Sequence, residues 1–152
     1  MLTYRIISVG KNKYRAFDAV ISEYQKRLSH YATFEFVSVP NYDENPYTQK
    51  IKEAEKIRTV IPQDTFLIVL DLRGKELKSE AFAEILKEAS LTHKHFTFII
   101  GGSNGLDQSL FNQANLVISF SKMTFPHELI KVFLVEQLYR AYDINTIRKY
   151  HK

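Results

Sequence analysis

The chain has 152 residues and a mass of 17.8 kDa, which suits a single domain over residues 1–152 and leaves no room for a second independent core. The absence of cysteine excludes a disulfide framework and a thiolate zinc site, and it fits a cytoplasmic protein without a metal. No apolar run approaches the roughly 18 to 20 residues of a membrane span. The net charge of +4 and the pI near 9.2 modestly favour a polyanionic partner such as RNA.

Strand and helix signals alternate along the whole chain. Apolar runs predict strands at Leu2–Val9, Phe34–Val39, Phe66–Asp71, Phe96–Ile100 and Leu116–Phe120. Apolar residues at helical spacing predict helices at Arg15–Leu28 and Tyr47–Val60, and further helices are predicted at Ser79–Ala89, Asp107–Ala114 and Pro126–Tyr142. Ser79 is expected to cap its helix. This alternation predicts an α/β fold with a mostly parallel sheet and helices on both faces.

Three of the predicted strands end in unusual loops, at Asp71–Lys75, Gly101–Leu106 and Ser121–Pro126. The carboxyl ends of parallel strands share one edge of a sheet, and ligands bind at that edge. We therefore expect these three loops to enclose one small molecule. A further loop, KNKYR at Lys11–Arg15, is strongly basic.

The glycine loop has two interpretations. Gly101, Gly102 and Gly105 allow positive φ and close backbone approach to a ligand, but they also suit an ordinary turn into a helix. The GGxxG spacing disfavours a dinucleotide fingerprint, and no Walker lysine follows.

The segment SKMTFPH at residues 121–127 is similarly open to two interpretations. Its backbone can bind a flat heterocycle, or Thr124 or Phe125 can form the cap of a helix that starts at Pro126. His127 falls in the first helical turn, where the helix dipole disfavours a charged imidazole, so a structural role is favoured.

Two features near the C-terminus point to partners. The helix at Pro126–Tyr142 is apolar over most of its circumference, which favours burial against both the sheet and a second subunit over a single deep core helix. The basic tail at residues 148–152 is either frayed and solvated or contacts RNA phosphates.

Five motifs occur in order along the chain: LDLRG at residues 70–74, IGGSNG at 100–105, SFSKMTFPHEL at 119–129, EQLYRA at 136–141 and YHK at 150–152. Together they closely resemble the RlmH family, the ribosomal large-subunit pseudouridine N3-methyltransferases of the SPOUT superfamily. The resemblance implies a SPOUT-type fold with a C-terminal trefoil knot. It also implies a homodimer whose cofactor sites lie at the subunit interface.

The resemblance further implies that S-adenosylmethionine (SAM) binds in the knot. Transferred by position, the cofactor-binding residues are Leu70, Gly101, Gly102, Phe120, Ser121, Lys122, Met123, Thr124 and Phe125, and Gly105 shapes the loop.

The implied substrate is a pseudouridine in a large-subunit rRNA stem-loop, methylated at N3 in the assembled ribosome. The expected catalytic residues are His151 as a base, Arg140 as a cation favouring the deprotonated imide, and Tyr150 stacking on the target base. Many relatives carry a different pair, often including proline, where Arg148 and Lys149 precede Tyr150 here, so the path of the tail departs from the family pattern.

Two competing hypotheses keep part of this picture. A non-catalytic RNA- or ribosome-binding module would have the basic surface and only a vestigial nucleotide pocket. An enzyme that uses another adenine-containing cofactor is disfavoured because the nucleotide fingerprints are missing.

Overall fold

The structure is a computed structural model that describes residues 1–102 and 104–147. Its elements in chain order are β1 (Leu2–Val9), α1 (Arg15–Arg27), β2 (Ala32–Val39), α2 (Pro46–Val60), β3 (Phe66–Glu76), α3 (Ser79–Ala89), β4 (His95–Ile100), α4 (Gln108–Gln113), β5 (Leu116–Ser119) and α5 (His127–Ile147). Each predicted strand and helix is present. Most boundaries agree with the prediction within two residues, and β3 and α5 are longer than predicted.

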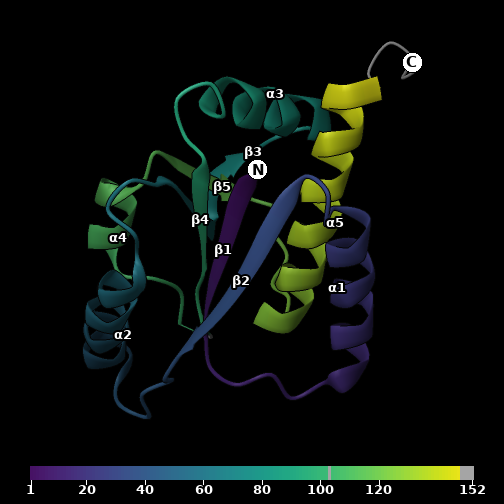
Figure 1. Cartoon of the computed structure of the whole chain (residues 1–152). Coiled ribbons are helices and arrows are strands. Elements are labelled where there is room, and N and C mark those ends of the chain that lie inside the picture. The colour runs from purple at the N-terminus through teal and green to yellow at the C-terminus, as the bar shows by residue number, and fades with distance from the viewer. Residues whose placement is uncertain (103, 148–152) are drawn as a thin grey trace.

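The strands form one sheet of five strands in the order β2-β1-β4-β3-β5, and every pairing in it is parallel. Figure 1 shows α1, α3 and α5 on one face of this sheet and α2 and α4 on the other. The predicted α/β class, with a parallel sheet between two helical layers, is confirmed. None of the helices in the described ranges has the length and apolar character needed to cross a membrane.

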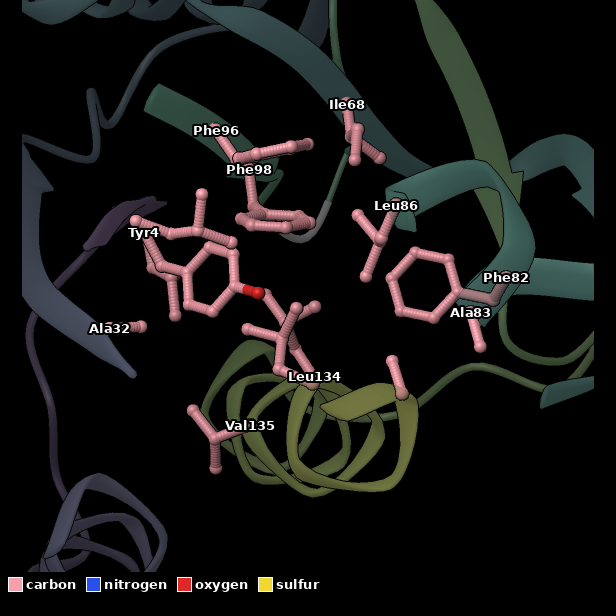
Figure 2. Close-up of a cluster of buried hydrophobic side chains, with 14 of the residues drawn as sticks. Tyr4, Ala32, Ile68, Phe82, Ala83, Leu86, Phe96, Phe98, Leu134 and Val135 are labelled. Atoms are coloured by element: carbon pink, nitrogen blue, oxygen red, sulfur yellow. The ribbon is translucent and has the colours of Figure 1, made fainter. Parts of the chain in front are cut away.

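Each face of the sheet buries its own hydrophobic cluster. On the α5 side, the rings of Tyr4, Phe96 and Phe98 belong to the same buried cluster as Leu134 of α5, as Figure 2 shows. The Tyr4 ring centroid is 5.9 Å from that of Phe98, in an edge-on arrangement that aromatic pairs favour. The other cluster joins the opposite faces of β1, β3 and β4 to α2 and α4. Burial on both faces explains why these strands show little polar alternation.

The prediction of a free loop at Asp71–Lys75 is wrong, because β3 continues through this segment to Glu76. Both Leu70 and Lys75 are in register with Ile118 of β5, so the strand is irregular between them. Gly74 lies so close to β5 that an added Cβ would be 2.5 Å from the carbonyl carbon of Ile118. The missing side chain allows the two backbones to approach each other.

Two helix starts also differ from the prediction. Ser79 does not cap α3; Lys78 occupies the N-cap position, and the Ser79 hydroxyl donates a hydrogen bond to Oε1 of Gln137 at 2.8 Å. The first bonds of α5 run to the Pro126 carbonyl, which accepts the N–H groups of Leu129 and Ile130 at 3.0 and 3.1 Å. Pro126, rather than Thr124 or Phe125, therefore precedes the first helical turn as its cap.

The last helix runs past its predicted end at Tyr142 to Ile147. Ile144 is buried, and the Asn145 amide donates to the Ala83 carbonyl at 3.0 Å. Contact with α3 thus stabilises an additional turn that the sequence pattern alone did not predict.

Candidate functional site

A cavity of about 470 Å³ opens at the carboxyl ends of β3, β4 and β5. Its lining residues are Lys50, Leu70, Asp71, Leu72, Arg73, Ile100, Gly101, Gly102, Asn104, Gly105, Ser119, Phe120, Ser121, Met123, Thr124, Phe125 and Ile130. The volume lies in the range of small-molecule sites, roughly 300 to 1,000 Å³. The three segments expected to surround one ligand therefore do meet around one cavity.

The structure gathers most of the predicted cofactor-binding positions in this cavity. Leu70 forms part of the wall, together with Gly101, Gly102, Phe120, Ser121, Met123, Thr124 and Phe125. Lys122 is exposed and is not among the lining residues. The wall on the β5 side is shaped by two local hydrogen bonds: the Ser119 hydroxyl donates to the Ser121 carbonyl at 2.7 Å, and the Met123 N–H donates to the Ser121 hydroxyl at 2.9 Å.

The glycine loop is both a turn and a cavity wall. Gly105 has a φ of 76° and donates its N–H to the Gly102 carbonyl at 3.1 Å, which closes the turn. Gly101 meets a different constraint, because an added Cβ would lie 2.7 Å from Cγ of the buried Leu106. Two glycines are thus required, one for its positive φ and one for close packing.

The end of β3 clamps this loop through Asp71 and Arg73. The Asp71 carboxylate, whose side chain is 7% exposed, accepts bonds from the Arg73 N–H at 2.9 Å and from Arg73 Nε at 3.0 Å. Arg73 Nη2 in turn donates to the Leu106 carbonyl at 2.8 Å. Burial alone would raise the pKa of Asp71, but the bonds and charge of Arg73 outweigh it and lower that pKa.

Helix α2 supports the same loop from the other side. Gln49 is buried; its amide donates to Oδ1 of Asn41 at 2.6 Å, and its Oε1 accepts from the Asn104 amide. Glu53 is 2% exposed, and an added Cβ on Gly102 would be 3.8 Å from its Oε1. Burial raises the pKa of Glu53, and its Oε2 has no hydrogen-bond partner within the described part of the chain.

Sequence reasoning did not identify these supporting side chains. The available signal was weak: Gln49 and Glu53 are polar residues four positions apart in a helix that reads as polar throughout, and Asp71 and Arg73 fell in a supposed loop. Their role becomes visible only once the sheet brings α2 and β3 to the glycine loop.

His127 lies in the first turn of α5 and is partly buried. Burial lowers the pKa of His127, and this effect exceeds the opposite effect of the Glu128 charge. The Nε2 atom of His127 is buried and has no hydrogen-bond partner among the described residues. A neutral imidazole here agrees with the structural role favoured from its place in the helix.

This lowered pKa predicts a pH-dependent contribution of His127 to stability. The unfolded chain takes up a proton near the ordinary histidine pKa of about 6.5, whereas the folded protein does so only at lower pH. The contribution of His127 to the free energy of unfolding is therefore complete above about pH 6.5, and it is lost as the pH falls through the pKa of His127 in the folded protein. We expect the difference in unfolding free energy between wild type and His127→Asn, measured by urea denaturation, to shrink from pH 7.5 to 5. A difference that stays constant would contradict the assignment.

Of the expected catalytic residues, Arg140 lies in the described part of the chain, and it does not line the cavity. Arg140 is exposed on α5, where its Nη2 pairs with Oε1 of Glu136 at 2.8 Å. It lies ten positions beyond Ile130, which lines the cavity, or about 15 Å along the helix axis. Tyr150 and His151 lie outside the described residues.

The fold and the cavity define an α/β protein with a cavity at the carboxyl edge of a parallel sheet, the edge at which ligands bind in such folds. A family profile described as "Predicted SPOUT methyltransferase" matches residues 2–151. The chain belongs to the SPOUT methyltransferase family, is therefore a methyltransferase, and the resemblance seen in its motifs is confirmed.

The similarity to individual relatives extends over nearly the full length. The chain is 45% identical over 152 residues to a protein of Caldicellulosiruptor bescii named "Ribosomal RNA large subunit methyltransferase H", covering 97% of this chain and 99% of that protein. It is 43% identical over 156 residues to a Clostridium botulinum protein of the same name, covering 97% and 98%.

Proposed function

We propose that this enzyme transfers the methyl group of SAM to N3 of a pseudouridine in large-subunit rRNA, acting on the assembled ribosome. The observation that carries the proposal is the cavity, in which Leu70, the glycine loop and the segment after β5 converge. Family membership supports methyl transfer, and the names of the relatives support large-subunit rRNA as the substrate.

The residues present fit this cofactor. Leu70, Ile100, Phe120 and Ile130 give the cavity apolar surface suited to an adenine ring. Backbone groups of the glycine loop and of the segment after β5 offer hydrogen bonds, as do the side chains of Ser121 and Thr124, which line the cavity. The anchored glycine loop would be ready before binding, which reduces the entropy cost of ordering it.

The chemistry requires alignment and removal of one proton. Bound SAM supplies an activated methyl group on a sulfonium. The chain would hold the acceptor N3 in line with it, and such positioning can contribute roughly 7 to 11 kcal/mol. We propose that His151 accepts the N3 proton, that Arg140 stabilises the deprotonated imide, and that Tyr150 stacks on the base.

We also propose a homodimer formed through α5. One face of this helix, including Leu134 and Leu138, is buried in the core, whereas Val132, Phe133 and Tyr139 remain partly exposed. A partner packed on this second face would cover them. Such an interface also offers Arg140 to the partner's cavity, because this side chain does not reach the cavity of its own chain.

The finer topology is proposed in the same way. Family membership supports a C-terminal part that threads a trefoil knot. The short distance between Gly74 and the backbone of Ile118 supports tight packing of the chain where β3 runs beside β5.

Two measurements test the proposed function. Calorimetric titration of the purified protein with SAM and with its demethylated product should show binding of both; no binding to correctly folded protein would reject it. Mass spectrometry of rRNA from cells lacking the gene should show the loss of one methyl group on a pseudouridine. An unchanged spectrum would favour a non-catalytic ribosome-binding protein instead.

His151→Ala is expected to lower turnover by about 100-fold or more, since a positioned general base contributes roughly 10² to 10⁴. Its affinity for SAM should stay nearly unchanged, because His151 is assigned to the acceptor and not to the cofactor. Single-turnover methylation and calorimetry measure the two effects. His95→Ala, which alters an exposed histidine at the amino end of β4, is the matched control. Equal activity of His151→Ala and wild type would remove His151 from the mechanism.

A further inference from the structure

The basic loop Lys11–Arg15 has no part in the proposed cofactor site, yet it is held firmly by α5. Glu128 is 4% exposed, and its carboxylate accepts the backbone N–H groups of Lys13 and Tyr14, the latter at 3.0 Å. Burial alone would raise the pKa of Glu128, but these two bonds, with nearby positive charges, lower it. A buried carboxylate is thus used to fix the main chain of an exposed loop.

A second buried charge on α5 acts on the same loop. Lys131 is 3% exposed and donates from Nζ to Oδ1 of Asn12 at 3.0 Å. Burial lowers its pKa, against the attraction of Glu128 and Asp18. Burying a charged group is costly unless it is paired and hydrogen-bonded. In α5 both charges satisfy this condition by bonding to residues 12–14.

This anchoring leaves the loop's cationic side chains free. Lys11, Lys13 and Arg15 are exposed, and Tyr14 is 56% exposed. Three cations and one aromatic ring therefore face solvent within five consecutive positions, on a main chain that is fixed in advance. Cations interleaved with an aromatic ring are suited to phosphates and a stacked base of RNA.

The loop lies at the same edge of the sheet as the cavity. It follows β1, whose last residue Val9 would be 3.3 Å from a Cβ added to Gly102 of the cavity wall. The residue before the loop, Gly10, lies beside His127: a Cβ added to Gly10 would be 3.5 Å from Cε1 of His127. His127 follows by two positions Phe125, which lines the cavity on the β5 side. Figure 1 shows this connection, in purple, running from β1 along the carboxyl edge of the sheet to α1.

We propose that Lys11–Arg15 is an RNA-backbone contact surface that binds phosphates near the nucleotide held at the cavity. The proposal rests on the proposed function, because it takes RNA as the substrate. It assigns the basic loop to the grip on RNA and leaves SAM binding to the cavity. Glu128 and Lys131 then act as positioning residues, which keep the loop in the shape that fits the RNA.

The first test removes the charge of the loop. Lys11→Ala/Lys13→Ala is compared with Lys87→Ala/Lys94→Ala, which removes the same charge from exposed sites near the amino ends of the strands. Assembled ribosomes from cells lacking the gene are the probe. We expect the loop variant to bind them about tenfold more weakly, and the slope of log affinity against log salt to decrease by about two. The control should bind like wild type, and both variants should bind SAM normally. Equal affinities of the two double variants would overturn the proposal.

The second test separates loop shape from net charge. Glu128→Gln makes the protein more positive, so simple attraction to RNA predicts tighter binding. If the carboxylate positions the loop, the variant should instead bind the ribosomes several-fold more weakly while retaining its melting cooperativity and its SAM affinity. Tighter or unchanged binding would overturn the positioning role. If Glu128→Gln fails to fold, the lysine variants still decide whether the loop contacts RNA.

The two proposals fail in different ways. Wild type that neither binds SAM nor methylates rRNA would refute the proposed function. Wild type that does both, with Lys11→Ala/Lys13→Ala indistinguishable from Lys87→Ala/Lys94→Ala, would refute only the role of the loop.

Discussion

Gly74→Ala is expected to destabilise the protein by about 3 kcal/mol or more, a large loss for a single added methyl group. The new Cβ would lie 2.5 Å from the carbonyl carbon of Ile118 and 2.7 Å from its Cα and its N. These are backbone atoms of β5, and Ile118 itself is buried in the core. No side-chain rotation can therefore relieve the clash, and β3 and β5 must separate.

Urea denaturation of Gly74→Ala against Gly102→Ala measures this effect. Gly102 is the matched control, because the atoms nearest to its added Cβ all belong to side chains: Cγ1 and Cβ of Val9 at 3.3 and 3.6 Å and Oε1 of Glu53 at 3.8 Å. The control should lose less than about 1 kcal/mol. If Gly74→Ala unfolds within about 1 kcal/mol of wild type, the close passage of the two strands is not a structural requirement.

Gly74 also shows why part of the fold escaped sequence reasoning. The strands β1, β4 and β5, and β3 as far as Leu70, are buried apolar runs, so hydrophobic pattern alone located them. The continuation LRGKE in β3 has no such pattern. It is extended because Lys75 and Glu76 pair with β5, and strand formation of this kind is decided by long-range contact rather than by local preference.

The candidate site divides along the same line. The glycine loop and the segment after β5 were predicted from the sequence, because each follows a strand that ends at the same edge of the sheet. The side chains that hold the glycine loop were not predicted. Their hydrogen bonds join residues far apart in the sequence: Arg73 and Leu106 are separated by 33 positions, and Gln49 and Asn104 by 55. Their partners are defined only by the folded sheet. Lys122 shows the opposite limit: six consecutive positions were assigned to the cofactor, yet one of them is absent from the cavity lining.

Gly101→Val is expected to weaken SAM binding by about 100-fold, or roughly 3 kcal/mol, while the protein stays folded. The valine side chain would clash with the buried Leu106 and not with the ligand. The added Cβ would be 2.7 Å from Cγ and 3.1 Å from Cδ2 of Leu106. Leu106 is buried under the glycine loop, and its carbonyl accepts the bond from Arg73. Displacing it would shift the loop that Asp71 and Arg73 hold.

A graded series tests this route of action. Gly101→Ala should weaken SAM binding less than Gly101→Val, because valine adds two further methyl groups at the same point. If Leu106 transmits the effect, Leu106→Ala should reduce the additional loss caused by Gly101→Ala, which calorimetry of the double-mutant cycle measures as a coupling energy. Thermal unfolding confirms that each variant is folded. Undiminished SAM binding by folded Gly101→Val would show that the cofactor does not depend on this wall of the cavity.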